Sequence, residues 1–181
     1  MHLRKRNPVS LSWLPLQVGN NQGTKGATTT EMKTVTQLSY MLLGWDDDAG
    51  VKLFEALRHA HTRGGLQKLK KLDLRFNDLG DETISSLAAF ITQGGLANLE
   101  QLFLSTNAIS GAGMDQLASA LERGGLPACN DLQLKSNPGD DGAVRAVLQQ
   151  RRHGGLVGGV DAPVSSSDEL AQREAINATR Q

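Results

Sequence analysis

Three adjacent carboxylates, Asp46, Asp47 and Asp48, are the most obvious candidate ligands for a metal ion in this 181-residue chain. Calcium and other hard cations take several oxygen ligands, and the rest of a calcium-binding loop is absent from the neighbouring residues. His59 and His61 stand two positions apart and would point to different sides of a helix, with no cysteine or carboxylate at ligand spacing. We therefore expect no metal site.

Cysteine and glycine offer two further kinds of chemistry. The one cysteine, Cys129, takes a position that leucine holds elsewhere in the chain, which favours a small core residue over a nucleophile. The segment 111–113, Gly-Ala-Gly, opens an expected helix but lacks the lysine of a phosphate-binding loop. Because no nucleophile and base stand at a suitable spacing either, we expect no catalytic residue, no cofactor and no enzyme activity.

A repeat with a period of about 30 residues runs through the middle of the chain, and such a period indicates an array of similar structural units. Four Gly-Gly pairs begin at residues 64, 94, 124 and 154. A leucine and asparagine pattern keeps the same step, at Leu69, Leu72, Leu74 and Asn77, then Leu99, Leu102, Leu104 and Asn107, then Cys129, Leu132, Leu134 and Asn137. One step earlier it falls on a weaker copy, Ser39, Leu42, Gly44 and Asp47.

Each period contains a strand pattern followed by a helix pattern. The segment LDLRF, residues 72–76, alternates apolar and other side chains, as a strand with one buried face does. Residues 84, 87, 88 and 91 are then apolar at helical spacing, and Gly94-Gly95 stands where that helix should end. One unit alone leaves two apolar sides open, so the units must stack into a solenoid to bury their leucines.

The pattern Leu-x-x-Leu-x-Leu-x-x-Asn-x-Leu, at residues 69–79 and with a final isoleucine at 99–109, resembles leucine-rich repeats. The long helical return resembles the ribonuclease-inhibitor-like subclass, which is also found in NOD-like receptors and Ran GTPase-activating proteins. Over residues 39–155 the resemblance implies an α/β solenoid. It would form a short horseshoe arc, with parallel strands on the concave face and helices on the convex face. We expect about four 30-residue repeats and a degenerate C-terminal cap.

The asparagine of the family pattern corresponds to Asn77, Asn107 and Asn137, with Asp47 at that place in the first copy. An asparagine amide both donates and accepts hydrogen bonds, so it can satisfy buried turn backbone in adjacent units. An ionised aspartate can only accept, which is compatible with a terminal unit that has one neighbour. We predict that these four residues form a structural ladder.

Strand positions between the leucines should point away from the core and form rows across neighbouring strands. Three of the seven aromatic residues fall there, and aromatic and arginine side chains supply most interface hot spots. The predicted partner-binding set is Trp45, Asp73, Arg75, Phe76, Phe103 and Lys135. Alanine at Trp45 and Phe103 should then abolish partner binding with little loss of stability. The alternative is that the rings pack on one another or beneath the N-terminal residues.

Charge divides the chain into unlike parts. Residues 1–30 contain four basic side chains and no acidic one, so the remainder contains 15 basic and 19 acidic side chains. We expect residues 1–35 to be a basic tail or a targeting segment without fixed structure, 36–155 to be the repeat domain, and 156–181 to be a degenerate terminal repeat with a cap helix and tail.

The balanced total charge predicts neither a nucleic acid nor an anionic membrane as a partner. No apolar run approaches the ~20 residues of a spanning helix. A single cysteine favours a reducing compartment, so we expect a cytoplasmic monomer, or an organelle protein targeted through residues 1–30.

The predicted function is a non-catalytic protein-interaction module, an adaptor or recognition domain that binds a protein partner on its strand face. The alternative is a GTPase-activating or regulatory protein similar to the Ran-directed ones. A GTP hydrolysis assay separates the two, since a binding module leaves the intrinsic rate unchanged.

Overall fold

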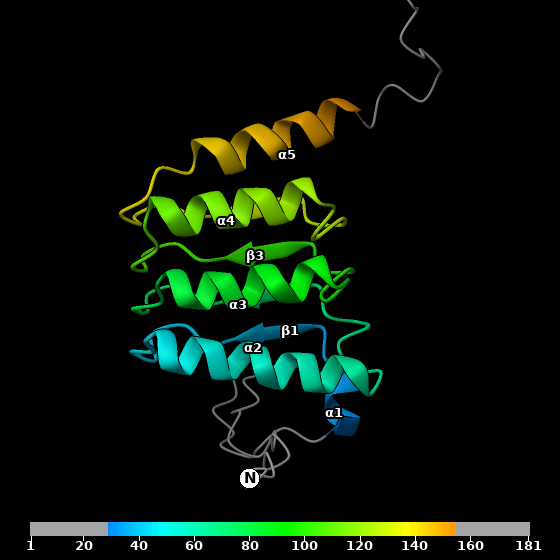
Figure 1. Ribbon diagram of the computed structural model, residues 1–181. Helices are drawn as coiled ribbons and strands as arrows, with labels where there is room; N and C mark the ends of the chain where they lie inside the picture. The colour runs from blue at the N-terminus through cyan, green and yellow to red at the C-terminus, as the bar shows by residue number, and fades with distance from the viewer. Residues whose placement is uncertain (1–28, 155–181) are drawn as a thin grey trace, which may run out of the picture. The chain divides into compact units, whose positions relative to one another are not determined.

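The computed structural model describes residues 29–154, which contain one parallel sheet and the helices that follow its strands (Figure 1). The elements in chain order are α1 (Thr29–Thr34), β1 (Gln37–Ser39), α2 (Asp47–Thr62), β2 (Lys71–Asp73), α3 (Asp81–Thr92), β3 (Gln101–Phe103), α4 (Gly111–Glu122), β4 (Asp131–Gln133) and α5 (Gly142–Gly154). We call one strand with the helix that follows it a coil, so the first coil is β1 with α2.

The four strands pair in chain order, β1-β2-β3-β4, and all pairs are parallel. Leu38, Leu72 and Leu102 align across the first three strands and are fully buried. The ladder continues past the strands, because the Leu74 amide donates to the Phe103 carbonyl at 2.8 Å and the Leu104 amide donates to Gln133 at 2.8 Å. The leucines of successive coils therefore form continuous buried files.

The helices α2, α3 and α4 lie in one layer over the strands (Figure 1). Their apolar residues face the sheet, as the helical spacing predicts: Ile84, Leu87 and Ile91 in α3, and Met114, Leu117 and Leu121 in α4, are buried. Each of α2, α3 and α4 ends just before a Gly-Gly pair. The first glycine of each pair has a positive φ (75°, 80° and 89°), the left-handed conformation that glycine adopts without strain.

The first coil departs from the regular step of the repeat. Gln37 in β1 pairs with Lys71 in β2, whereas Lys71 pairs with Gln101 in β3, so the first step is longer than the second by four positions. The extra positions lie within α2, which has 16 residues while α3 and α4 have 12 each. This insertion is close to one α-helical turn, so both ends of the helix keep their places in the layer.

This extra turn corrects the predicted alignment of the first copy. The inward positions of the first coil belong to Leu38 and Tyr40, not to Leu42 and Gly44. Tyr40 is fully buried, and its amide donates to the Asp73 carbonyl at 2.8 Å, the bond that Leu74 makes one coil later. Leu42 instead lies in the turn after the strand and is 67% exposed.

The predicted tail boundary at residue 35 also needs correction. Met32 in α1 is fully buried, Val35 is 4% exposed, and the Leu66 amide donates to the Met32 carbonyl at 2.7 Å. Residues 29–35 are therefore part of the packed domain, because Met32 and Val35 belong to its buried core. Residues 1–28 and the predicted degenerate repeat at 156–181 lie outside the described residues. Of the described residues, 29–148 belong to one compact unit and 149–154 to a second unit.

Candidate functional site

The outer face of the sheet carries a compact cluster formed by Lys71, Asp73, Arg75 and Phe103. Arg75 and Asp73 form a two-point ion pair, with Nε to Oδ1 at 2.9 Å and a terminal guanidinium nitrogen to Oδ2 at 2.6 Å. The Arg75 guanidinium also lies 5.0 Å from the centre of the Phe103 ring, and Lys71 Nζ lies 4.8 Å from it. Two cations therefore cover one aromatic ring, an arrangement that the ring quadrupole stabilises.

Two residues of this cluster are buried, so the cluster contributes to the stability of the fold as well as to its surface. Phe103 is only 6% exposed and Asp73 is 4% exposed, although both point away from the leucine core. Hydrogen bonding to Asp73 raises the pKa of Arg75, so the guanidinium stays charged. Because Phe103 is covered, alanine there would remove packing as well as surface. Phe103 is therefore a poor position at which to test binding separately from stability.

Exposed apolar side chains gather beside this cluster. Among residues 31–152, the large hydrophobic side chains classed as exposed are Leu42 (67%), Phe76 (45%) and Leu43 (36%), and we call these three the apolar patch. Leu42 and Phe76 take the same position in adjacent coils, and each has a positive φ (61° and 58°). Bulky residues rarely adopt this conformation, so both side chains are held out from the turn at a cost in backbone strain.

The structure brings together only part of the predicted binding set. Asp73, Arg75 and Phe103 are in contact, and Phe76 follows Arg75 in the turn after β2. Lys135 is exposed and lies two coils away from Arg75, where it lines a depression beside Leu132, Leu134 and Arg145.

Trp45 was predicted on the outer row beside Arg75, and the structure corrects this. It lies in the loop between β1 and α2, half-buried, with its ring stacked on Tyr40 at 4.9 Å between centroids. The one-turn insertion causes the difference, because the register of β1 with β2 gives the row position beside Arg75 to Met41. The aromatic ring that lies under cations on this face is that of Phe103, and the cations are Lys71 and Arg75.

Asn107 binds the backbone of two coils. Its Oδ1 accepts from the Leu79 amide at 3.1 Å, and its Nδ2 donates to the carbonyls of Leu74 and Leu104, each at 3.0 Å. Asn107 is 8% exposed, so water cannot readily replace these bonds. The amide supplies two donor hydrogens on Nδ2 and a separate acceptor oxygen, so one side chain can satisfy all three backbone groups.

Asn77 and Asn137 make the same kind of contacts in their own coils. The Asn77 amide donates to Tyr40 and Leu74, and its oxygen accepts from the amides of Leu43 and Trp45. The Asn137 amide donates to Leu104 and Leu134, and its oxygen accepts from Ile109. Each asparagine thus links its own turn to the preceding coil.

Asp47 is not part of this ladder, contrary to the prediction. It is the first residue of α2, and its Oδ1 accepts from the Gly80 amide at 2.8 Å and from the amide and hydroxyl of Thr83 at 2.9 and 2.5 Å. It therefore caps the start of α3 in the next coil. Asp81 does the same for Ser110 at the start of α4. Asp46, one of the three adjacent carboxylates, is the N-cap of α2, and its side chain accepts from the Ala49 amide.

We expect Asp47→Asn to weaken the acid sensitivity of the fold. Burial alone would raise the pKa of Asp47, but hydrogen bonds from Thr83, Gly80 and Glu82 outweigh it and lower the pKa below the ordinary 3.8. A lowered folded pKa means that the stabilisation is fully present above the unfolded pKa and is lost as the pH falls through the folded pKa. Urea unfolding measures the free energy of unfolding at pH 7 and at pH 3. The decrease in this free energy between the two pH values should be smaller for the variant than for wild type.

The matched control is Asp48→Asn, one residue further along the same helix turn, which should keep the pH difference of wild type. Equal pH differences in wild type and the Asp47 variant would contradict the capping role. At pH 7 the loss on Asp47→Ala should be about 1 kcal/mol, as for other helix caps.

Sequence reasoning missed Leu42 and Lys71 as surface residues of this region. One signal was available: residues 37–40 (Gln-Leu-Ser-Tyr) match the pattern of residues 71–74 (Lys-Leu-Asp-Leu) better than residues 41–44 do. The contact of Lys71 with Phe103 depends on the pairing of β2 with β3, which no local pattern encodes.

Within residues 29–154 no group of three or more histidine, cysteine, aspartate or glutamate side chains is placed to hold a metal ion. In the same part of the chain, no helix combines the length and apolar character needed to cross a bilayer. Cys129 is half-buried against the core, and its Sγ lies 3.8 Å from the Asp131 carbonyl oxygen.

No protein-family model matches this chain, and no curated protein matches it. Among solved structures, leiomodin-1 actin-binding site 2 is similar, with a TM-score of 0.52, 13% sequence identity, and coverage of 81% of this chain and 92% of that chain. At this identity the likeness concerns the fold alone. The chain is a parallel-strand α/β protein whose successive coils are consistent with a repeat solenoid.

Proposed function

We propose that this chain is a non-catalytic protein-recognition module of the leucine-rich-repeat class, similar to the ribonuclease-inhibitor-like subclass. The outer sheet face at the first two coils, formed by the apolar patch with Met41, Lys71 and Arg75, is the binding surface. The observation that carries the proposal is the grouping of Leu42, Leu43 and Phe76 beside a rigidly held arginine. Exposed apolar side chains that gather at one place typically mark interaction sites.

The chemistry of this surface favours a protein partner. Large apolar side chains and an arginine supply most of the binding energy in protein interfaces. Arg75 is oriented before binding by its two-point pair with Asp73, so little side-chain entropy is lost when a partner contacts it. The fold likeness to an actin-binding site makes actin the first purified protein to test.

The test replaces residues of the apolar patch with asparagine, which tolerates the left-handed backbone conformation found there. Leu42→Asn and Phe76→Asn together remove apolar surface at two positive-φ positions, where asparagine is better tolerated than leucine or phenylalanine. We expect this double variant to bind the partner at least about 10-fold more weakly while its melting temperature stays equal or rises, since two anchors are worth at least ~1.4 kcal/mol. Binding is measured with immobilised full-length chain, first against actin and then against proteins captured from the native source.

The matched control is Thr106→Asn with Ser136→Asn, which places the same residue at the corresponding positive-φ positions (57° and 60°) of the third and fourth coils. It should bind like wild type. Equal binding by wild type and both double variants would remove the patch from the proposal. The GTPase-activating alternative is assayed in the same preparations, where we expect no change in GTP hydrolysis by candidate small GTPases.

A further inference from the structure

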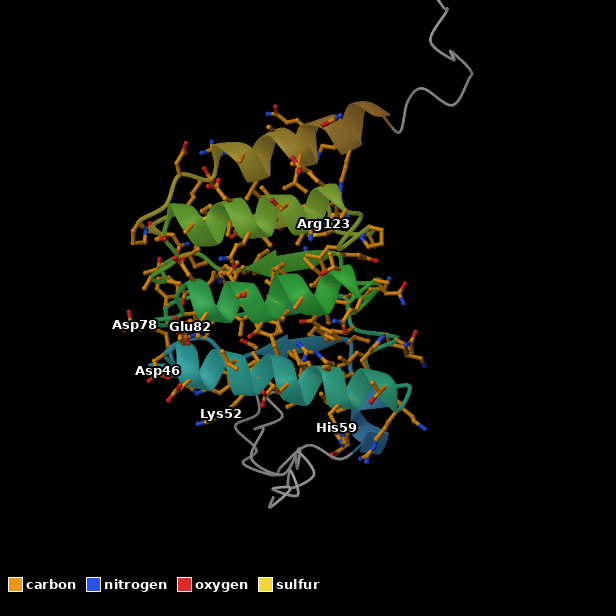
Figure 2. The ribbon with its side chains drawn as sticks, in the orientation of Figure 1. Asp46, Lys52, His59, Asp78, Glu82 and Arg123 are labelled. Atoms are coloured by element: carbon orange, nitrogen blue, oxygen red, sulfur yellow. The ribbon has the colours of Figure 1, made fainter. Side chains whose placement is uncertain are left out.

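One edge of the sheet is acidic at the turns of the first, second and fourth coils. The four turns between each strand and its helix contain no lysine or arginine over residues 42–48, 76–82, 106–112 and 136–142. Their carboxylates form what we call the acidic edge: Asp46, Asp47, Asp48, Asp78, Asp81, Glu82, Asp140 and Asp141. Of these, Asp141 is ion-paired with Arg145. Figure 2 shows Asp46, Asp78 and Glu82 grouped at the starts of α2 and α3, while His59 and Arg123 lie towards the other ends of their helices.

The acidic edge adjoins the apolar patch. Leu42 and Leu43 precede Asp46 in the first turn, and Phe76 precedes Asp78 in the second. The two turns are bonded to each other, because the Asp78 amide donates to the Trp45 carbonyl at 2.8 Å. Asp46, Asp78 and Glu82 are exposed. This surface therefore combines apolar contact area with a negative field, and its complement is a segment that is both basic and apolar.

This chain contains such a segment outside the described residues. Residues 4–18 read RKRNPVSLSWLPLQV, with three cations followed by an apolar stretch that includes Trp13 and Leu14. The first acidic residue of the chain is Glu31, so nothing in the segment opposes the field of the acidic edge. Charge complementarity and apolar character both match the surface at Leu42 and Phe76.

The chain between this segment and α1 is long enough to reach. The distance from Thr29 to Leu42 cannot exceed the length of the chain between them. This chain consists of the short helix α1, ~9 Å long at ~1.5 Å per residue, and an extended stretch of ~23 Å at ~3.3 Å per residue. Residues 19–28 connect the segment to α1, and this connection spans up to ~33–36 Å when extended. A short tether gives an effective concentration on the order of millimolar, so a segment with a Kd on the order of 100 μM would still occupy the patch in most molecules.

We propose that residues 4–18 bind the apolar patch and the acidic edge of their own chain. The apolar stretch around Trp13 covers Leu42 and Phe76, and Arg4, Lys5 and Arg6 face the carboxylates of Asp78 and Glu82. A protein partner that uses the same patch then has to displace this segment. The intramolecular contact itself does not require the proposed function, because it is measured on the free chain.

Trp13 is the reporter for this contact. The chain has two tryptophans, so Trp45→Phe leaves Trp13 alone, and its accessibility is read from emission wavelength and acrylamide quenching. In that background we expect a blue-shifted Trp13, quenched less than in a synthetic peptide of residues 1–28. Adding L42N and F76N should raise quenching to the value of the peptide, whereas adding T106N and S136N should leave it unchanged.

The electrostatic part has its own pair of variants. Asp78→Asn with Glu82→Gln should raise Trp13 quenching part of the way to the peptide value. Asp115→Asn with Glu122→Gln, which remove the same charge from exposed positions on α4, should not. Raising the salt concentration to 1 M shortens the screening length to about 3 Å. It should therefore also raise Trp13 quenching, as Asp78→Asn with Glu82→Gln does. If Trp45→Phe alters the far-ultraviolet spectrum, the difference in emission between wild type and W13F reports Trp13 with Trp45 intact.

Three results would overturn the proposal. The first is equal quenching of Trp13 in the Trp45→Phe chain and in the peptide of residues 1–28. It would mean that the segment does not bind. Protection that grows with protein concentration would assign the patch to a second copy of the chain. Equal effects of the patch pair and of the T106N and S136N pair would mean that Trp13 is buried elsewhere. None of these measurements involves a partner, so they are independent of the binding test for the proposed function.

Discussion

Replacing Asn107 with alanine should destabilise the fold by about 2–4 kcal/mol, because the buried Leu79 amide loses its hydrogen-bond partner while two carbonyls each lose one of two side-chain donors. The Leu79 amide and the carbonyls of Leu74 and Leu104 all bond to this one side chain, which is 8% exposed. A buried group left without a hydrogen bond costs ~1–3 kcal/mol, and this cost applies to the Leu79 amide. The carbonyls of Leu74 and Leu104 keep the bonds from Asn77 and Asn137 and therefore lose less. Since the three groups belong to two coils, the substitution weakens both a turn and the contact between neighbouring coils.

Asn107→Asp tests whether donation, not only polarity, is required. A carboxylate has nearly the same shape but cannot donate to Leu74 and Leu104, and it would place a charge in a buried site. We expect it to destabilise the protein at least as much as alanine does at pH 7. Equilibrium urea unfolding measures both changes, with the midpoint lowered in each variant.

The control for this pair is Asn98→Ala. Asn98 is exposed, and its amide donates to the Gln67 carbonyl of the preceding coil at 3.0 Å. Water can replace that bond, so the loss should stay within about 0.5 kcal/mol. If Asn98→Ala and Asn107→Ala lowered the unfolding midpoint equally, burial of the ladder would not be what makes it stabilising.

Gly139→Ala should cost about 3 kcal/mol for a different reason, which is a collision with the backbone of the preceding coil. A Cβ at residue 139 would overlap the carbonyl carbon and oxygen of Ser110 and would lie 2.7 Å from the Gly111 nitrogen. The Gly139 amide also donates to the Ile109 carbonyl at 2.9 Å, so moving the turn away would break a bond between coils. Backbone atoms cannot rotate aside as a flexible side chain would.

Gly111→Ala is the matched control, because it lies against the same turn yet has nothing within 4 Å of the added Cβ. Its φ is not positive, so alanine reduces the entropy of the unfolded chain without strain, and stability should stay equal or rise by about 0.4–1 kcal/mol. Thermal unfolding followed by circular dichroism compares the two variants. Similar melting temperatures for both would show that the turn at Gly139 adjusts freely.

Much of the fold follows from local patterns in the sequence. The alternation in residues 72–76 predicted a strand with its leucines buried, and Leu72 and Leu74 are buried. The Gly-Gly pairs predicted where helices end, because glycine alone adopts the left-handed conformation there without strain. Asn77, Asn107 and Asn137 were identified because the amide of asparagine is suited to bond with turns above and below it.

The candidate site was predictable only in part. Arg75, Asp73 and Phe103 were correctly grouped, since they lie on outward positions of adjacent strands whose register follows the regular step of the repeat. Trp45 and Asp47 were misplaced, since the first coil contains one additional helical turn and the register of its strand is shifted accordingly. Such an insertion preserves the apolar spacing within the helix and the Gly-Gly pair at its end. Neither of these two patterns therefore reveals it.

By itself, the sequence determined the period, the buried leucines, the helix ends and the asparagine positions, because each depends on spacing within a single coil. Only the tertiary structure decided which side chains meet across coils. It placed Lys71 and Arg75 over Phe103, set Asp47 as the cap of the following helix, and exposed Leu42 beside Phe76. These contacts join residues that lie a full coil apart in the chain, and they depend on strand pairing that one extra turn of helix can shift.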